Sequence, residues 1–171
     1  MKSLAAIIHA RKTSTRCPNK HLRPFGNTTL IDIALENLSK LDVDEKYLAG
    51  NCHHSIMYRH LKKVKSEFIV NYNPCQPFLQ VDKLNHCIKV FKENTMKSMI
   101  TVQKERNFFW DETSTPINFK PNDRLSTTAG PWVYSATHSL VFYEKNYMLS
   151  EWELFPNTKD SPFPLIIDWP E

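Results

Sequence analysis

A short apolar run near the start of the sequence reads Leu4-Ala5-Ala6-Ile7-Ile8 and is bounded by polar residues on both sides. Continuous apolar runs of this length are typical of a strand that is buried on both faces of a sheet. A long polar loop, 9–27, follows this run, and apolar residues then recur at helical spacing from Leu30 to Leu41. Strand, loop and helix in this order predict the repeating unit of a parallel α/β sheet.

The same alternation of strand and helix continues along the first hundred residues. Further strands are predicted at 47–49, 68–70 and 99–102, with helices at 56–64 and from Asp82 onward. A strand at 139–142, a helix at 143–149 and a last strand at 164–168 complete the pattern. We therefore expect one α/β domain over residues 1–171, built as three layers, α/β/α, around a mostly parallel sheet.

Length and composition restrict the class of protein. The 171 residues are 41% hydrophobic and 12% aromatic, which disfavours a disordered chain. No apolar run approaches the roughly 20 residues that cross a bilayer, so we expect no membrane contact and a cytoplasmic location. The cysteines show no Cys-x-x-Cys pairing and are predicted to be reduced thiols; they are Cys17, Cys52, Cys75 and Cys87.

Positive charge is concentrated in the loop after the first strand. Six Lys and Arg residues and no acidic residue occur before Asp32, leaving 16 Lys and Arg against 18 Asp and Glu in the rest of the chain. Nucleic-acid surfaces more often spread their cations over a face with interleaved aromatics, so we expect no nucleic-acid partner. The cations either belong to a solvated loop or neutralise an anionic ligand, and their mutual repulsion favours the ligand.

The side chains of this loop suit a triphosphate. Ligands of α/β sheets bind beyond the carboxyl ends of the strands, where this loop begins. Arg presents a planar fork to phosphate oxygens, Lys a compact charge, and Ser14 a hydroxyl group. With only three glycines, the chain cannot build a glycine-rich phosphate cradle, so binding has to depend on side-chain charge.

The spacing of these residues resembles a known signature. The pattern Arg-x-x-Ser-x-Arg-x-Pro-x-Lys-x-Leu, filled from Arg11 to Leu22 and followed by Arg23-Pro24-Phe25-Gly26, is similar to that of the acylneuraminate cytidylyltransferases and the related CMP-KDO synthetases. His21 stands where an Asn is usual in that signature. The resemblance implies the nucleotide-diphospho-sugar transferase fold, which is similar to glycosyltransferase A.

Weaker similarities follow in the order of the family. The segment 72–79 resembles the family segment Gln-Pro-Thr-Ser-Pro-Leu-Arg, which lines the nucleotide pocket, and 98–119 resembles a stretch leading toward the sugar. Ile167-Asp168-Trp169-Pro170-Glu171 resembles the carboxylate motif that holds magnesium, although Ile166 replaces its first aspartate. The chain is also shorter than the family between Tyr47 and Phe68. The segment 107–131, rich in Asn, Thr, Pro and aromatic residues, is expected to leave the sheet toward the sugar site or a dimer contact.

The resemblance implies a reaction and a set of residues. The protein would move CMP from CTP to an acidic, acylneuraminate-like sugar and release pyrophosphate, with Mg²⁺ as cofactor and a homodimer as the assembly common in the family. Arg11 and Lys20 are the expected catalytic residues. Nucleotide binding is assigned to Ala10, Arg11, Ser14, Arg16, Lys20 and Asn73, and the metal to Asp168.

Two alternatives to this function stay open. Loss of one motif aspartate would suit a degenerate relative that keeps the anion loop and binds a nucleotide without catalysis. A nucleotidyltransferase for another sugar would share the same first loop. Under any of the three readings, Arg11, Arg16 and Lys20 are predicted to face one common hollow.

Overall fold

The computed structural model describes residues 2–11, 14, 17–50, 54–126, 128–156 and 161–167. Strands, helices and one short 3-10 helix, η1, alternate along the chain. In order they are β1 (Leu4–Ala10), η1 (Lys20–Leu22), β2 (Pro24–Phe25), β3 (Thr28–Thr29), α1 (Leu30–Ser39), β4 (Glu45–Gly50), α2 (His54–Leu61), β5 (Phe68–Tyr72), α3 (Val81–Glu93), β6 (Met99–Arg106), β7 (Trp132–Glu144), α4 (Lys145–Glu151) and β8 (Phe163–Ile166).

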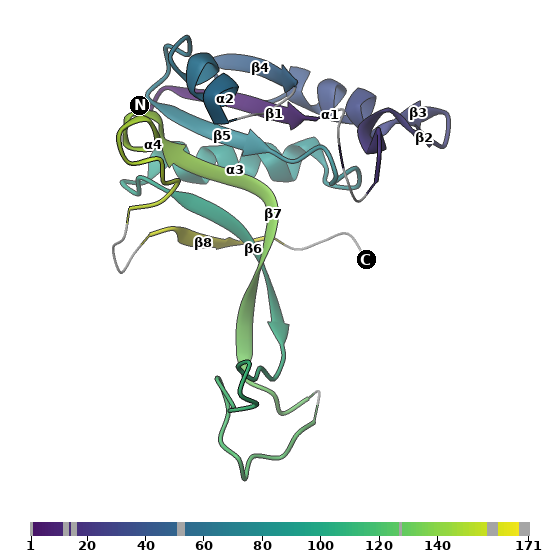
Figure 1. Cartoon of the computed structure of the whole chain (residues 1–171), viewed down its shortest axis with the longest axis vertical. Helices are drawn as coiled ribbons and strands as arrows, with labels where there is room; N and C mark the ends of the chain where they lie inside the picture. The colour runs from purple at the N-terminus through teal and green to yellow at the C-terminus, as the bar shows by residue number, and fades with distance from the viewer. Residues whose placement is uncertain are drawn as a thin grey trace.

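One six-stranded sheet organises the fold, in the order β4-β1-β5-β7-β6-β8 (Figure 1). Strand β1 pairs in parallel with both β4 and β5, and β6 pairs in parallel with β8. Strand β7 is antiparallel to both of its neighbours. The sheet is therefore mostly parallel, as the alternation of strands and helices predicted, with one reversed strand in its interior.

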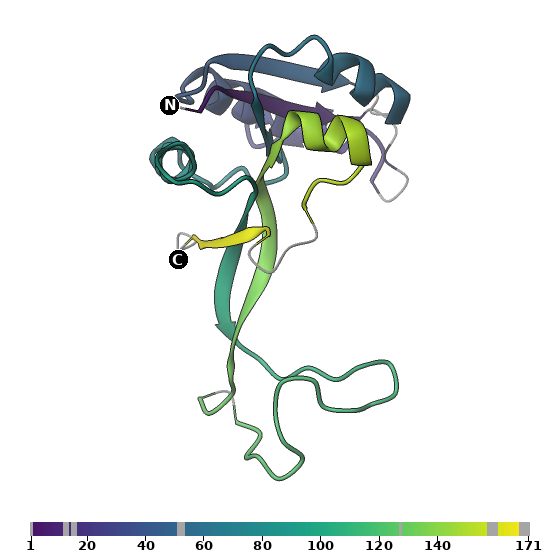
Figure 2. The same cartoon turned by 90° about the vertical axis from the view of Figure 1, so that its left-hand side faces the viewer.

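Helices cover both faces of the sheet and give two hydrophobic clusters. Even-numbered residues of β1, such as Leu4 and Ile8, pack with residues of α1 and α3, whereas Ala5 and Ile7 pack with residues of α2 and α4. In Figure 2, α3 and α4 accordingly lie on opposite sides of β7. The expected three-layer arrangement is confirmed, and it buries β1 on both faces, which explains its continuous apolar run.

Helix α1 begins where the hairpin of β2 and β3 ends. Gly26, with a positive φ of 62°, lies in the turn between the two strands, a conformation that favours glycine. Thr29 then caps the helix: its Oγ1 accepts a hydrogen bond from the Asp32 backbone N–H at 3.2 Å and donates one to Asp32 Oδ2 at 2.7 Å. Cap and hairpin together fix the end of the first loop against the helix.

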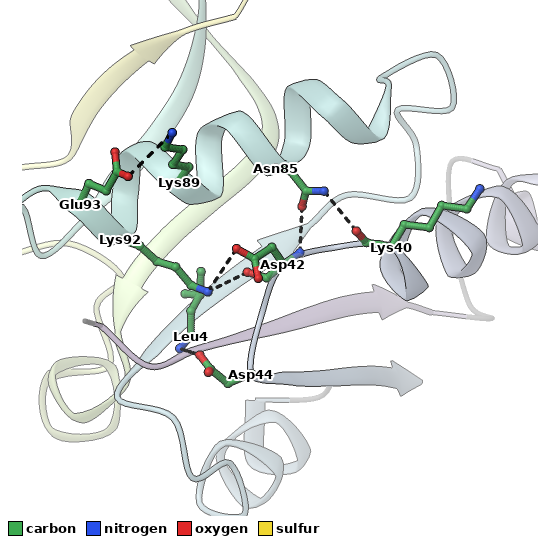
Figure 3. Close-up of polar contacts among 8 residues, drawn as sticks. All are labelled: Leu4, Lys40, Asp42, Asp44, Asn85, Lys89, Lys92 and Glu93. Carbon is green, nitrogen blue, oxygen red and sulfur yellow. Dashed lines mark hydrogen bonds and ion pairs between the residues drawn. The ribbon is translucent and has the colours of Figure 1, made fainter.

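The connection from α1 to β4 is clamped by α3 (Figure 3). Asn85 Oδ1 accepts from the Asp42 backbone N–H at 2.8 Å, while Asn85 Nδ2 donates to the Lys40 carbonyl at 3.1 Å. Lys92 Nζ donates to the Asp42 carbonyl at 2.8 Å, and Asp44 Oδ2 accepts from the backbone N–H of Leu4 at 2.8 Å. The bonds from α3 hold this connection in place, and the bond from Asp44 ties it to the start of β1, at the end of the sheet opposite to the first loop.

Strands β6 and β7 continue beyond the other strands as a two-stranded arm, with 107–131 at its tip (Figure 1). The tip contains an isolated bridge between Trp110 and Pro116, and Phe119 meets Phe108 and Trp110 edge-on at 5.1 and 4.8 Å between ring centroids. The described residues of this tip, 107–126 and 128–131, belong to none of the strands of the six-stranded sheet. Its role at a sugar site or dimer contact stays a prediction.

A bulge marks the joint between sheet and arm. The pairing of β6 with β7 shifts between Ile100 and Val102, and His138 on β7 has a positive φ of 54°. Thr101 Oγ1 accepts from the Leu140 backbone N–H at 3.1 Å, and Thr137 Oγ1 donates to the Thr101 carbonyl at 3.1 Å. The Thr101 and Thr137 side chains therefore form hydrogen bonds with backbone groups that the regular pairing of β6 and β7 leaves without a partner at the bulge.

The described elements extend several of the predicted ones. Strand β7 is 13 residues long, although only 139–142, in its buried C-terminal part, is predicted, because its arm portion alternates between half-buried and exposed residues. The last strand ends at Ile166 rather than 168. Cys17, Cys75 and Cys87 are free thiols, and no described helix is long and apolar enough to cross a membrane.

Candidate functional site

The site lies at the carboxyl ends of the parallel strands. Strand β1 ends at Ala10, which pairs with Gly50 at the end of β4, and the first loop leaves the sheet at this point. A cavity of about 320 Å³ lies under the loop. Its described lining residues are Ala10, Arg11, Asn19, His21, Leu22, Ile31, Leu48 and Gly50. The volume falls at the small end of the range of small-molecule sites, about 300 to 1,000 Å³.

The predicted residues of the first loop occupy different places around this cavity. Ala10 and the exposed Arg11 line it. Ser14 Oγ accepts a hydrogen bond from the Cys17 backbone N–H at 3.4 Å and so shapes the loop itself. Lys20 is half-buried in η1, next to the lining residues Asn19 and His21, but is not itself in the lining. Arg16 and Asp168 lie outside the described residues.

Asn73 lies on a second loop, which follows β5. Its Oδ1 accepts from the Cys75 backbone N–H at 3.0 Å, and its own backbone N–H donates to the Ser139 carbonyl at 3.0 Å. Farther along the loop, Gln76 Nε2 donates to the Thr137 carbonyl at 3.2 Å. The second loop is therefore held against the bulge of β7, and Asn73 already uses its side-chain oxygen to form a turn.

The two loops touch at two points. His21 Nε2 and Cys75 Sγ lie 3.5 Å apart, within hydrogen-bond distance for sulfur. The rings of Phe25 and Phe78 meet edge-on with centroids 5.9 Å apart, and both remain exposed to solvent, Phe78 by 67%. These contacts bring the second loop, which carries Asn73, against the first loop at the carboxyl ends of the parallel strands.

His21 is a site residue for which the sequence analysis assigned no role. Its side chain is only 6% exposed, and its Nδ1 is the one buried side-chain polar atom of the described residues that has no hydrogen-bond partner. Such an unpaired atom costs about 1–3 kcal/mol. Burial, and then the charge of Lys20, lower the pKa of His21, which favours the neutral imidazole. In the sequence, the sign that marked this position is that His21 replaces the Asn usual in the family signature.

A polar cluster of the half-buried His9 and Asn71 with the buried Tyr143 supports the site from the opposite face of the sheet. Asn71 Oδ1 accepts from His9 Nε2 at 3.0 Å and from the Tyr143 hydroxyl at 3.3 Å. Burial is the main cause that lowers the pKa of His9, with Asn71 opposing it and the charges of His60 and Arg11 adding to it. Burial also raises the pKa of Tyr143. The cluster ties β1, β5 and β7 together where the two site loops leave the sheet.

The described residues do not supply a magnesium site of their own. No group of three or more His, Cys, Asp or Glu side chains is arranged to hold a metal among the described parts of the chain. Mg²⁺ usually binds through one or two carboxylates together with substrate phosphates. The one motif carboxylate, Asp168, lies outside the described residues, and Ile166 offers no ligand in place of the first.

Comparison with known proteins supports the suspected family. Residues 5–53 match the cytidylyltransferase family model, which covers β1, the first loop, α1 and β4. Against curated proteins, the chain shows no significant sequence match.

Solved structures extend the likeness along the chain. CMP:2-keto-3-deoxy-manno-octonic acid synthetase complexed with CTP superposes with a TM-score of 0.66 at 10% identity, covering 96% of this chain and 90% of that one. The 4-diphosphocytidyl-2C-methyl-D-erythritol synthase of Anaerococcus prevotii gives 0.61 at 15% identity, covering 97% and 86%. A cytidylyltransferase of Leptospira borgpetersenii gives 0.57 at 14% identity, covering 88% and 63%.

These findings agree with the resemblance that the first loop indicated. The identities are low, so the superpositions show the fold, and the family model adds the sequence pattern of the N-terminal part. The chain thus carries the cytidylyltransferase pattern over residues 5–53 and has, over nearly its whole length, the nucleotide-diphospho-sugar transferase fold.

Proposed function

We propose that this protein is a cytidylyltransferase that moves CMP from CTP to an acidic, acylneuraminate-like sugar and releases pyrophosphate. The observation that carries the proposal is the position of the first loop. The loop lies within residues 5–53, which match the cytidylyltransferase model, and it leaves the sheet at the carboxyl end of β1, where Arg11 lines a cavity of ligand size.

In the proposed reaction, the sugar hydroxyl oxygen attacks the α-phosphorus of CTP in line. A new P–O bond forms, the bond from the α-phosphorus to the bridging oxygen breaks, and the hydroxyl proton is lost to solvent. Catalysis of this kind is mainly positioning and charge stabilisation. Arg11, Arg16 and Lys20 would hold the triphosphate, and Lys20 would stabilise the charge that grows on the leaving pyrophosphate.

The remaining residues have supporting roles in the proposal. The backbone at Ala10 and the hydroxyl of Ser14 would border the phosphates, and Asn73 would contact the base or ribose from the second loop. Asp168 is the one motif carboxylate that could ligate Mg²⁺, an ion that would neutralise phosphate charge when it is bound.

The acidic sugar substrate is the most specific element of the proposal. It is supported by the first-loop signature, which resembles that of enzymes acting on sugar acids, and by the superposition on the CMP:2-keto-3-deoxy-manno-octonic acid synthetase. The methylerythritol synthase superposes nearly as well, which keeps open a nucleotidyltransferase for another sugar.

A homodimer through the arm is also proposed. Several large apolar side chains at the arm are about half exposed, which is unusual for a surface that contacts only water; they include Trp110, Ile117, Leu125, Trp132 and Tyr134. Light scattering after size exclusion would show a dimer for the wild type, and Ile117→Ser with Leu125→Ser would shift it toward the monomer. A wild-type monomer at micromolar concentration would contradict this assembly.

Measurement of pyrophosphate release tests the function directly. The purified protein is incubated with Mg²⁺, each of the four ribonucleoside triphosphates and a panel of acidic sugars and sugar phosphates, and CTP binding is measured in parallel. Turnover with CTP and an acidic sugar is the expected result. CTP binding without turnover across the panel would favour the non-catalytic relative, turnover with a sugar phosphate would favour the other sugar, and absence of CTP binding would refute all three.

A further inference from the structure

The cavity under the first loop combines an apolar wall with one buried polar atom that lacks a partner. Its lining includes the side chains of Leu22, Ile31 and Leu48, and His21 stands among them with its Nδ1 unpaired in the described structure. We propose that this cavity receives the base ring of the substrate nucleotide, and that His21 donates a hydrogen bond from Nδ1 to a carbonyl oxygen of that ring. The inference rests on the proposed function and makes His21 a nucleotide-binding residue.

The walls of the cavity suit a ring better than phosphates. Arg11 is the only charged residue among the described ones that line it, whereas a triphosphate needs several cationic donors. Small-molecule sites typically combine apolar walls with a few polar groups that fix the orientation of the ligand. The charge of Arg11 at the end of β1 therefore suits the first phosphate, and the apolar interior suits the flat part of the same nucleotide.

The neighbouring thiol decides which hydrogen-bonding role His21 plays. A neutral imidazole carries its proton on one ring nitrogen only, and the other nitrogen accepts. Cys75 Sγ lies 3.5 Å from Nε2, and a thiol is a poor acceptor for N–H but can donate its S–H to a nitrogen lone pair. This arrangement favours the proton on Nδ1. The ligand must then present an acceptor, such as the carbonyl oxygen of a pyrimidine.

Access to Nδ1 requires a small movement. The atom is closed off from solvent, so η1 has to shift for a ligand oxygen to reach it. The polar contact of the imidazole among the described residues is the one with Cys75 Sγ at 3.5 Å, and the neighbouring Leu22 is 52% exposed. Nucleotide binding should consequently change the environment of His21 itself, which can be observed without any substitution.

The first test follows His21 by NMR in the intact wild-type protein. Histidines are labelled with ¹⁵N, His21 is assigned with the His21→Asn variant, and CTP, UTP, GTP and ATP are added in turn. The expected result is an Nδ1-protonated neutral signal that shifts when a pyrimidine triphosphate is added. The Nε2-protonated tautomer, or a His21 signal unmoved by all four nucleotides, would overturn the inference.

The second test separates the ring from the phosphates. Binding of CTP and of inorganic tripolyphosphate is measured for the wild type, His21→Ala, His21→Phe and the control His86→Ala, which removes an exposed histidine on α3. Loss of one neutral hydrogen bond should weaken CTP binding by about 3- to 10-fold in both His21 variants. Tripolyphosphate binding and the control should not change. An equal loss for both ligands would show that His21 only supports the loop, and no loss for CTP would also overturn the inference.

The nucleotide series also distinguishes this inference from the proposed function. If UTP or GTP shifts His21 and binds while CTP does not, the protein is not a cytidylyltransferase, but the cavity still holds a base. If CTP binds and turns over while His21 stays unmoved, the proposed function stands and the assignment of His21 is wrong.

Discussion

Replacement of Arg11 by Met should weaken CTP binding by roughly tenfold. Arg11 is the only charged side chain among the described residues that line the cavity, and no other described lining residue offers a cation to a phosphate. A hydrogen bond to a charged group contributes about 1.5–3 kcal/mol. Because Arg11 is exposed, water and salt reduce its contribution, so we expect the lower value of about 1.5 kcal/mol, which corresponds to roughly tenfold in the dissociation constant.

Titration calorimetry with CTP measures this effect, with Lys120→Met as the matched control. Lys120 is exposed on the arm, so the control removes one positive charge from the chain without changing the site. Met retains much of the aliphatic length of either side chain, and only the position of the lost charge differs. The control should bind CTP like the wild type, whereas Arg11→Met should not.

Salt gives an independent check on the same reasoning. The screening length falls from about 10 Å at 0.1 M to about 3 Å at 1 M ionic strength, so the difference between Arg11→Met and the wild type should become smaller as salt is added. Equal affinity for CTP in Arg11→Met, Lys120→Met and the wild type at low salt would refute the placement of the phosphates beside Arg11.

Further predictions concern the loop, a helix cap, the core and pH. Lys20→Ala should abolish CTP binding or turnover in calorimetry and pyrophosphate assays, and unchanged affinity would contradict its assignment to the triphosphate. Thr29→Ala removes the cap of α1 and should lower the free energy of unfolding by about 1 kcal/mol in a urea titration, with Thr29→Ser as the conservative control. Phe91→Ala should lower it by about 3–5 kcal/mol, because the ring is fully buried and stacks on Phe142 at 4.7 Å, and a loss below 1 kcal/mol would contradict this packing. Although desolvation opposes it, hydrogen bonds from Ser66, Tyr47 and the Lys65 backbone lower the pKa of Glu45 to about 2 from 4.5. The folded pKa is the lower one, so this stabilisation is complete above pH 4.5 and is lost between about pH 4.5 and pH 2. Thermal melts of Glu45→Gln should accordingly depend less on pH over this range than those of the wild type.

The layers of the fold could be predicted because the strands that build them have simple patterns. Leu4 to Ile8 is apolar throughout because β1 is buried on both faces, and α1 shows helical periodicity because only one of its faces meets the sheet. The reversed direction of β7 could not be predicted in this way. A buried strand has the same apolar pattern whichever way it runs, and its direction depends on pairing with β5 and β6, which are distant in the sequence.

For a similar reason, the candidate site could be predicted only in part from the sequence. The cations of the first loop lie close together in the sequence, so their concentration is evident without a structure, and Arg11 does line a cavity. His21 and Cys75 are 54 positions apart, and their contact depends on how two loops fold over the sheet edge. An isolated histidine or cysteine gives no sign of such a pair, and only the replacement of the usual Asn marked position 21.

The bulge between Ile100 and Val102 has a mechanical consequence for the molecule. The same two strands form the interior of the sheet and the shaft of the arm, and Gln76 fastens the second loop to Thr137 at the joint between them. A tilt of the arm at this joint would therefore move Thr137 and, through its hydrogen bond, Gln76 of the second loop. Because Cys75 of the second loop contacts His21, such a movement would reach the lining of the cavity.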